Sequence, residues 1–144
     1  MTTHILVVDD NEPDRELLKM VLQFNGYRVT VAGNGVEALA AARSDRPDAI
    51  VSDVLMPQMD GFTLCQNWMK DAELSGIPFI FYSANLTLGM DAHVGKVLGA
   101  ARYLIKPLRQ ESFLQELKTV LLQWGVRSRP ADPTLVPGKV RTPE

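Results

Sequence analysis

The sequence predicts an α/β fold in which five parallel strands alternate with five helices. Five short aliphatic or β-branched runs of strand length recur along the chain, and segments with apolar residues at helical spacing separate them. The chain has 144 residues, of which 46% are hydrophobic, so one domain can bury a sizeable core. Strict alternation of the two element types indicates a parallel sheet covered by helices on both faces.

The first strand is expected at residues 5–8, a continuous aliphatic run that ends at Asp9 and Asp10. A helix then begins after Asn11, whose side chain suits an N-cap, and ends at the Asn-Gly pair of residues 25–26. The apolar face of this helix is expected to comprise Leu17, Leu18, Val21 and Leu22.

The second strand is expected at residues 27–31, where alternating side chains indicate a more exposed strand. Asn34 and Glu37 have the spacing of a capping box, so the second helix opens there and stops before Pro47. The residues expected to face inward are Val36, Leu39 and Ala40.

The third strand, at residues 49–51, is a short apolar run typical of a buried central strand, and Asp53 follows it. Pro57 and Gly61 then mark a turn before the third helix, which ends near residues 75–76. The apolar residues of that helix are Phe62, Leu64, Cys65, Trp68 and Met69.

The fourth strand is expected at residues 77–82, followed by Ser83. A helix between residues 88 and 98 is the weakest of the set, because Gly89 and Gly95 each cost roughly 1 kcal/mol relative to alanine. Its expected apolar face is Met90, Val94, Val97 and Leu98.

The fifth strand covers residues 102–105 and ends on Lys106 and Pro107. The last helix is expected to place inward Phe113, Leu114, Leu117, Val120, Leu121 and Trp124. We therefore expect one domain at residues 1–124, followed by a proline-rich and basic linker or disordered tail at 125–144. That tail is too short for another domain, so any output module would belong to a longer parent chain or a separate protein.

Five strands joined by right-handed crossovers favour the flavodoxin-like, doubly wound order 2-1-3-4-5. In that order the first, third, fourth and fifth strands are neighbours, about 4.8 Å apart. Ligands gather beyond the carboxyl ends of such strands. The polar residues expected to meet there are Asp9, Asp10, Asp53, Ser83 and Lys106.

Three carboxylates in one crevice repel each other unless a cation is present. Mg²⁺ suits a site with few protein ligands, because it keeps several waters and accepts a phosphate oxygen. We expect Asp10 and Asp53 to bind Mg²⁺, with Asp9 orienting it through water. Asp53 would be the nucleophile that attacks a phosphorus atom, while Lys106 and Ser83 would bind the remaining phosphoryl oxygens.

These motifs resemble the receiver domain of two-component response regulators over residues 4 to about 124. The motifs that carry the resemblance are Asp9-Asp10, Ser52-Asp53, Met56-Pro57, Asp60-Gly61, Ser83-Ala84, Tyr103 and Lys106-Pro107. The resemblance implies that the backbone carbonyl of Leu55 also binds the metal. It further implies that Tyr103 is an aromatic switch and that the bond before Pro107 is cis.

The resemblance also implies a switch protein rather than an enzyme, although the domain would catalyse its own phosphorylation and dephosphorylation. Its partner would be a histidine kinase or a phosphotransfer protein, and the fifth strand and last two helices could support a homodimer. The sequence departs from the common pattern at the hydroxyl residue, which is Ser83 rather than threonine, and in residues 98–102, which lack acidic side chains. Leu55 and Asn85, at positions that tune phosphoryl lifetime in the family, are apolar and neutral.

Bulk properties exclude several other classes. The net charge of −2 gives no general attraction to nucleic acid or an anionic membrane, and no apolar run approaches the roughly 20 residues of a membrane span. Asp9 and Asp10 interrupt any signal-peptide core, so we expect a soluble, cytoplasmic protein. Cys65, the single cysteine, is expected to be buried, and His4 and His93 are expected at the surface.

The main alternative comes from residues 31–38, where Gly33, Gly35 and Ala38 fit a dinucleotide-binding fingerprint and Asp53 follows at a suitable distance. That hypothesis gives no role to Asp9 or Lys106, and it needs a longer chain. A flavodoxin-type FMN carrier is disfavoured because its phosphate loop would be rich in hydroxyls and amides. A receiver fold that acts only as a docking module, without phosphorylation, is the third alternative.

Overall fold

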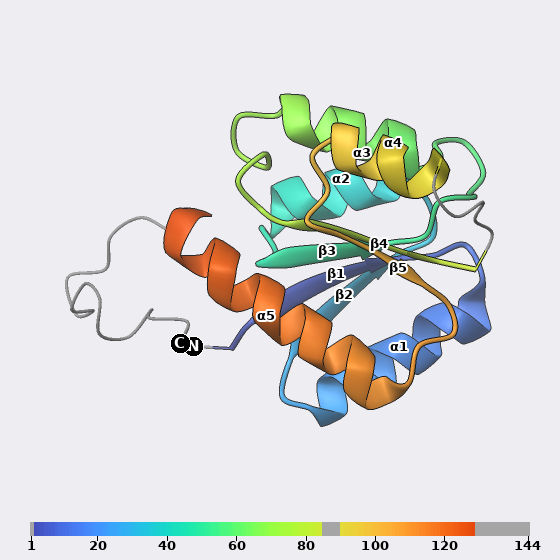
Figure 1. The fold of residues 1–144 in the computed structure, drawn as a ribbon, viewed down its shortest axis with the longest axis vertical. Helices are drawn as coiled ribbons and strands as arrows, with labels where there is room; N and C mark the ends of the chain where they lie inside the picture. The colour runs from blue at the N-terminus through green and yellow to red at the C-terminus, as the bar shows by residue number, and fades with distance from the viewer. Residues whose placement is uncertain (1, 85–89, 129–144) are drawn as a thin grey trace.

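A computed structural model describes residues 2–84 and 90–128 of the chain. It contains a parallel sheet of five strands in the order β2-β1-β3-β4-β5, which confirms the predicted fold (Figure 1). In chain order the elements are β1 (His4–Val8), α1 (Glu12–Phe24), β2 (Arg28–Ala32), α2 (Gly35–Ser44), β3 (Ala49–Ser52), α3 (Gly61–Lys70), β4 (Phe79–Ser83), α4 (Met90–Val97), β5 (Arg102–Ile105) and α5 (Gln110–Ser128).

Two layers of helices cover the sheet. Helices α2, α3 and α4 lie over one face and helices α1 and α5 over the other (Figure 1). Side chains alternate along each strand, so Leu6 and Val8 of β1 pack toward α2 and α3, whereas Ile5 and Val7 pack toward α1 and α5. The sheet is therefore covered on both faces, which explains why the inner strands β1 and β3 are buried along their whole length and largely apolar in sequence.

The strand register brings the carboxyl ends of the strands to one edge. Val8, the last residue of β1, pairs with Ala32 at the end of β2 and with Ser52 at the end of β3. Ser83 and Ile105 pair at the ends of β4 and β5. Residues that directly follow these strands consequently lie at the same edge of the sheet.

Side-chain caps begin three of the helices. Asn11 accepts a hydrogen bond from the Asp14 N–H at 2.9 Å, and Asn34 accepts one from Glu37 at the same distance. The Glu37 carboxylate reaches back to the Gly33 N–H at 2.9 Å, one residue before the position that a standard capping box uses. As expected, helix α1 ends at Phe24 and is followed by Asn25 and Gly26. The positive φ of Gly26, 92°, suits a residue without a side chain.

Four residues expected to face inward are exposed instead. Leu17 is 62% exposed, Val97 is 71% exposed, and Val36 and Ala40 also face solvent. In α2 the inward stripe comprises Ala38, Leu39 and Ala42. The prediction for α2 was therefore right for Leu39 and wrong for Val36 and Ala40, and the small side chains of Ala38 and Ala42 let the helix lie close to the sheet.

The expectation for His4 was also wrong, since its side chain is buried. His4 opens β1 between β2 and β3, and its ring nitrogens lie 2.7 Å from Thr30 Oγ1 and 3.2 Å from the Arg46 carbonyl oxygen. His93 is exposed and Cys65 is buried, as predicted. Burial raises the pKa of the Cys65 thiol to about 12, which keeps it protonated and unreactive.

Three element boundaries differ from the predictions. Helix α5 continues past Gly125 to Ser128, since a single glycine inside a helix costs only about 1 kcal/mol. Strand β4 begins at Phe79 rather than at residue 77, since Pro78 has no N–H to donate. Helix α3 ends at Lys70, before residues 75–76, because the Asp71 carboxylate accepts the Glu73 N–H and starts a turn.

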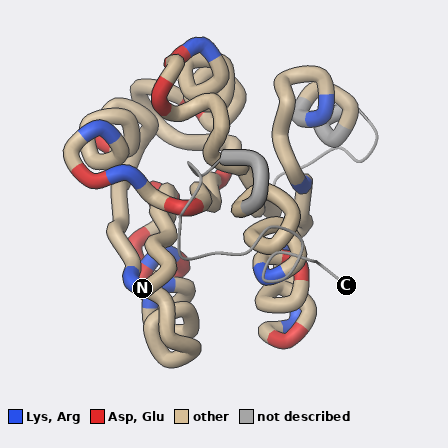
Figure 2. The backbone as a smooth tube through the Cα atoms, turned by 90° about the vertical axis from the view of Figure 1, so that its left-hand side faces the viewer, with Lys and Arg blue, Asp and Glu red and all other residues tan. Residues whose placement is uncertain are grey.

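The predictions for Asn85, Gly89, the side chain of Met90 and residues 129–144 lie outside the described part of the chain. Among the described helices, none has the length and apolar character required to cross a membrane. Basic and acidic residues are interspersed along the described backbone, as Figure 2 shows.

Candidate functional site

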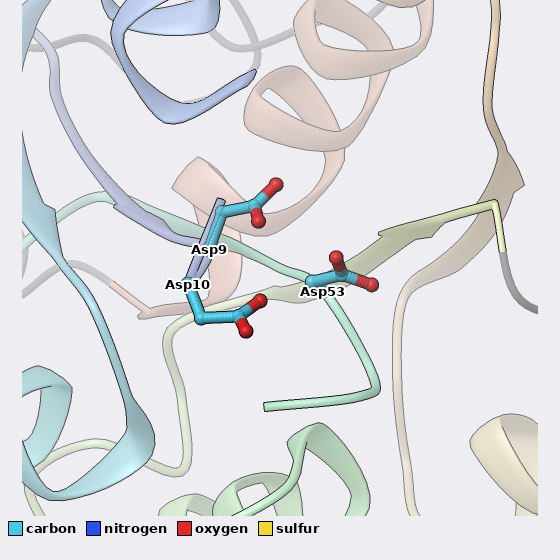
Figure 3. A group of neighbouring side chains, drawn as sticks. All are labelled: Asp9, Asp10 and Asp53. Carbon is cyan, nitrogen blue, oxygen red and sulfur yellow. The ribbon is translucent and has the colours of Figure 1, made fainter. Parts of the chain in front are cut away.

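Three carboxylates gather where β1 and β3 end. Asp9 and Asp10 directly follow β1, and Asp53 directly follows β3 (Figure 3). One oxygen from each carboxylate can be chosen so that all three atoms lie within 4.8 Å of one another. Asp9 and Asp53 are buried, whereas Asp10 is exposed, so the group opens to solvent on the Asp10 side.

The alternation of side chains along the strands decides which groups meet most closely. Asp9 continues the alternation of Ile5 and Val7, which face α1 and α5, and Asp53 continues that of Ala49 and Val51. Lys106 follows Leu104 on the same side of β5. These three ionisable groups therefore share the α1/α5 side, while Asp10 belongs to the opposite side.

Backbone amides orient the two buried carboxylates. Asp53 Oδ1 accepts a hydrogen bond from the Val54 N–H at 2.7 Å, and Asp9 Oδ1 accepts one from the Asn11 N–H at 2.9 Å. The Asp53 N–H donates to the Val8 carbonyl at 2.9 Å, which extends the β1–β3 pairing by one residue. One oxygen of each carboxylate is thus fixed by the backbone, and the other faces its neighbours.

Lys106 supplies the positive charge of the site. Its ammonium nitrogen lies 2.7 Å from Asp9 Oδ2 and 3.8 Å from Asp53 Oδ2, and its side chain is 16% exposed. Burial alone would lower the pKa of Lys106, but the hydrogen bond to Asp9 and the charges of the nearby carboxylates outweigh burial and raise that pKa. Lys106 is therefore a cation at neutral pH.

The loop after Asp53 approaches it closely because residue 61 is glycine. A Cβ atom at Gly61 would collide with the Asp53 carbonyl oxygen and would lie 2.9 Å from Val54 Cα. The Gly61 N–H donates to the Val54 carbonyl at 2.7 Å, and Asp60 caps α3 by accepting the Thr63 N–H at 2.8 Å. The Asp60-Gly61 pair thus folds the loop back beside Asp53 and starts the next helix.

Two of the remaining predicted site residues, Ser83 and Tyr103, lie on the α3 side of the sheet. Ser83 ends β4 and is fully buried, and Tyr103 of β5 packs against Phe81 with ring centroids 5.4 Å apart. Ser83 continues the alternation of Phe79 and Phe81, which face α3, so Ser83 and Tyr103 share the side opposite Lys106.

Ala84, Leu55 and Pro107 lie in the loops around the site. Ala84 and Pro107 line a hollow that reaches from Asp9 and Lys106 between α1 and α5. The bond between Lys106 and Pro107 is cis, as expected. Leu55 is exposed in the loop that follows Asp53.

Two residues near Lys106 were missed in the sequence. Asp14, in the first turn of α1, has a carboxylate oxygen 3.5 Å from Lys106 Nζ. The Tyr82 ring centroid lies 5.5 Å from the same nitrogen, and the Tyr82 hydroxyl accepts the Leu108 N–H at 3.2 Å. Strand alternation could have indicated Tyr82, because Tyr82 and Leu104 pair in the β4–β5 register and Lys106 lies two residues further on the same side.

The donor set fits a hard divalent cation. Carboxylate oxygens are the ligands that Mg²⁺ prefers, and an open side at Asp10 leaves room for the waters that Mg²⁺ retains. Lys106 balances only part of the negative charge of Asp9, Asp10 and Asp53. A further cation therefore suits these residues, which agrees with the expected cofactor.

The glycine-rich turn does not resemble a free phosphate-binding loop. The backbone N–H groups of Gly33 and Glu37, which a pyrophosphate would need, are already bonded to Glu37 Oε1 and Asn34 Oδ1. A Cβ atom at Gly35 would lie 2.8 Å from Met59 Sδ, so this glycine serves the packing of α2. These contacts explain the glycines without a dinucleotide.

Comparisons of the sequence with known proteins indicate one and the same family. The family described as "Response regulator receiver domain" matches residues 5–118. Response regulator MprA from Mycobacterium bovis is 39% identical over 132 residues, covering 92% of this chain and 54% of that protein. The chain thus spans about half the length of the curated relatives it matches.

Solved structures agree with the sequence match. Chemotaxis protein CheY4 of Vibrio cholerae aligns with a TM-score of 0.79 at 33% identity, covering 83% of this chain and 99% of that one. The receiver domain of a sensor histidine kinase from Pseudomonas aeruginosa, solved with a magnesium ion coordinated in its active site cleft, aligns with a TM-score of 0.73 at 30% identity, covering 86% and 98% of the two chains. Sequence, fold and the arrangement at the sheet edge agree, and the chain belongs to the receiver domain family of response regulators, in keeping with a phosphorylation-activated switch of two-component signalling.

Proposed function

We propose that this receiver domain accepts a phosphoryl group on Asp53 and that the resulting acyl phosphate controls its surface. The observation that carries the proposal is the position of Lys106, whose ammonium lies 3.8 Å from Asp53 Oδ2 while it is hydrogen-bonded to Asp9. A carboxylate fixed by the backbone beside an ammonium group, at the carboxyl end of a parallel sheet, suits attack on a phosphorus atom. The proposal uses every ionisable group that the strands bring to this edge.

The transfer is a displacement at phosphorus. An oxygen of the Asp53 carboxylate forms the new O–P bond with its lone pair, and the bond from phosphorus to the donor breaks. The donor atom keeps that electron pair: the histidine ring nitrogen in a phosphohistidine, or the acetate oxygen in acetyl phosphate. The Val54 N–H holds Asp53 Oδ1 at 2.7 Å and so fixes the plane of the attacking carboxylate.

Asp10 and Asp53 would bind Mg²⁺ directly, Asp9 would orient it through water, and the Leu55 carbonyl would be a further ligand. Bound Mg²⁺ would neutralise the phosphoryl oxygens and reduce the repulsion between the donor and the carboxylates. Lys106 and Ser83 would bind the other oxygens of the transferred group, Lys106 from the α1/α5 side and Ser83 from the α3 side. Ala84 leaves space beside Ser83, and Pro107 fixes the turn after Lys106.

The response to phosphorylation would begin at Ser83. Movement of its hydroxyl toward the new oxygens would make room beside β4, and Tyr103 would turn inward against Phe81, which its ring already contacts. The α4–β5–α5 surface would then change its shape and its choice of partner. The domain would thus be a switch that catalyses its own phosphorylation and dephosphorylation.

A histidine kinase or a phosphotransfer protein would be the donor, in the cytoplasm. The curated relatives are about twice as long as the matched region, which supports an output domain in a longer parent chain or in a separate effector. A homodimer through α4, β5 and α5 is part of the same proposal. The domain itself would have no direct contact with nucleic acid or membrane.

The test is intact-mass analysis after incubation with Mg²⁺ and acetyl phosphate. The wild-type domain should gain the mass of one phosphoryl group, and the Asp53→Asn variant should gain none, because an amide is a poor nucleophile. Asp45→Asn is the matched control, since it removes a carboxylate at the opposite end of the sheet and should leave the gain intact.

Phosphorylation of the Asp53→Asn variant would refute the assignment of the acceptor. If the wild-type domain gains no mass from acetyl phosphate or from a phosphorylated kinase, yet binds Mg²⁺, it acts as a docking module without phosphorylation. Omission of Mg²⁺, or its removal with a chelator, should abolish the gain in the wild-type domain.

A further inference from the structure

Asp14 is a fourth carboxylate in the site, outside the motifs that identify the family. It lies in the first turn of α1, and its backbone N–H donates to the N-cap Asn11 at 2.9 Å, which fixes its place on the helix. One of its carboxylate oxygens lies 3.5 Å from Lys106 Nζ, and its side chain is 53% exposed. Asp14 is therefore a second ion-pair partner for Lys106 on the α1 side.

The three distances around Lys106 show in which direction its ammonium is held. They are 2.7 Å to Asp9, 3.5 Å to Asp14 and 3.8 Å to Asp53, so the two nearer oxygens belong to Asp9 and to α1. A phosphoryl group on Asp53 would draw the ammonium toward Asp53, whose oxygen is the farthest of the three. That movement lengthens the contact with Asp14.

The surroundings of Lys106 allow this movement. A hollow of about 410 Å³ lies between α1 and α5, and Asp14, Lys106 and Tyr82 are among the residues that line it. The Tyr82 ring lies 5.5 Å from the ammonium, and its hydroxyl is held by the Leu108 N–H. The ammonium of Lys106 therefore lies over a fixed ring and beside open space, so side-chain packing does not lock it in one position.

We propose that Asp14 is a positioning residue that holds Lys106 on the α1 side and so slows phosphorylation of Asp53. The inference rests on the proposed function, because it concerns the rate of the same transfer. Asp14 does not touch the reacting atoms; it acts through Lys106. Its contact with Lys106 weakens as Lys106 reaches the transferred group, so the contact stabilises the unphosphorylated arrangement more than the phosphorylated one.

The test compares rates of phosphorylation by acetyl phosphate in the presence of Mg²⁺. Asp14→Asn should raise the rate about two- to fivefold, the range that corresponds to a half-exposed ion pair. Glu12→Gln is the matched control, because Glu12 is another exposed carboxylate in the first turn of α1 and its removal changes the general charge equally. Asp14→Glu, which keeps the carboxylate, should return the rate close to that of the wild-type domain.

A second measurement reports on Lys106 directly. With ¹³C-labelled lysine, the resonance of the Lys106 ε-methylene group should move in Asp14→Asn and stay in place in Glu12→Gln. Equal rates for Asp14→Asn and Glu12→Gln, or an unmoved Lys106 resonance in Asp14→Asn, would overturn the inference. A wild-type domain that is not phosphorylated would instead refute the proposed function, while the resonance would still decide whether Asp14 positions Lys106.

Discussion

A buried polar residue lies at each end of strand β1: His4 begins the strand and Asp9 directly follows it. The two side chains have different kinds of partner. At the amino end, His4 is 2% exposed, and at the carboxyl end, Asp9 is 5% exposed. The ring nitrogens of His4 contact Thr30 and the Arg46 carbonyl, and its backbone N–H donates to Asp48 at 2.8 Å. Asp9 instead shares one lysine with two other carboxylates.

The difference lies in how completely each buried group is satisfied. Around His4, a carbonyl and a hydroxyl meet the two ring nitrogens at hydrogen-bond distance and the Asp45 carboxylate lies 3.9 Å from Nδ1, so the polar atoms of the ring have partners and the arrangement stabilises the fold. Around Asp9, negative charges outnumber the single ammonium of Lys106, so the arrangement can still accept a cation or a phosphoryl group with its metal. A buried polar group thus has its partners at one end of the sheet, whereas at the other end it belongs to a cluster with excess negative charge.

Replacing Lys106 should have the largest effect on stability. Lys106→Met leaves Asp9 and Asp53 buried beside each other without their cation, which should lower the free energy of unfolding by about 3 kcal/mol. Urea unfolding measures this change, and added Mg²⁺ should recover part of it by replacing the lost positive charge. Lys70→Met, at the exposed end of α3, is the control and should change stability little.

A Lys106→Met domain as stable as the wild type without Mg²⁺ would contradict this account of the carboxyl end. It would mean that the carboxylates become protonated or separate at little cost. The buried carboxylates would then be no less stable in their surroundings than the hydrogen-bonded ring of His4.

At the amino end, His4→Ala should lower the free energy of unfolding by about 2 kcal/mol, because it leaves a cavity and unpaired polar groups at Thr30 and Arg46. The rate of phosphorylation by acetyl phosphate should stay the same below the unfolding transition. Urea unfolding and the intact-mass assay test the two halves of this prediction. A changed rate in the folded His4→Ala domain would show that the two ends of the sheet are coupled.

The sequence predicted the carboxyl end much better than the amino end. Asp9 and Lys106 directly follow apolar runs and Asp53 lies two residues after one, and parallel pairing carries such residues to one edge whatever the details of packing. His4 was predicted at the surface because it has no carboxylate or cysteine neighbour at metal-ligand spacing in the sequence. Its burial comes from the strands on both sides of β1, a tertiary feature that no local pattern contains.

The errors in the helices have a similar origin. Helical spacing indicates which side of a helix is apolar, but it does not indicate how wide the buried stripe is. Leu17 and Val36 lie at the edges of the apolar sides of their helices, and the packing of each helix leaves these two side chains exposed. Asp14 was missed because an aspartate in the first turn of a helix is ordinarily explained by the helix dipole. Its contact with Lys106 depends on how α1 is placed against β5, which spacing along the chain does not indicate.

The smallest expected effect concerns the pH dependence of the two ends. Near His4, Asp45 accepts a hydrogen bond from the Arg28 guanidinium at 2.6 Å, which holds the pKa of Asp45 below its ordinary value of 3.8. A lowered pKa in the folded state contributes stability that is present above pH 3.8 and is lost as the pH falls through the lower value. Lys106 has the opposite sign: its pKa is raised above 10.5, so its contribution is present below that pH and is lost at higher pH.

The contribution of Asp45 to stability should therefore be lost at acid pH, and that of Lys106 at alkaline pH. The stability difference between the wild-type domain and Asp45→Asn, measured by urea unfolding, should be constant near neutral pH and shrink below about pH 3.8. Arg28→Gln is the matched partner variant and should show the same loss of acid dependence, because either change removes the same pair. A difference that persists unchanged through the acid range would mean that Asp45 does not titrate with folding. The alkaline limit should respond to Lys106→Met and not to Asp45→Asn, since the raised pKa of Lys106 arises among the carboxylates at the other end of the sheet.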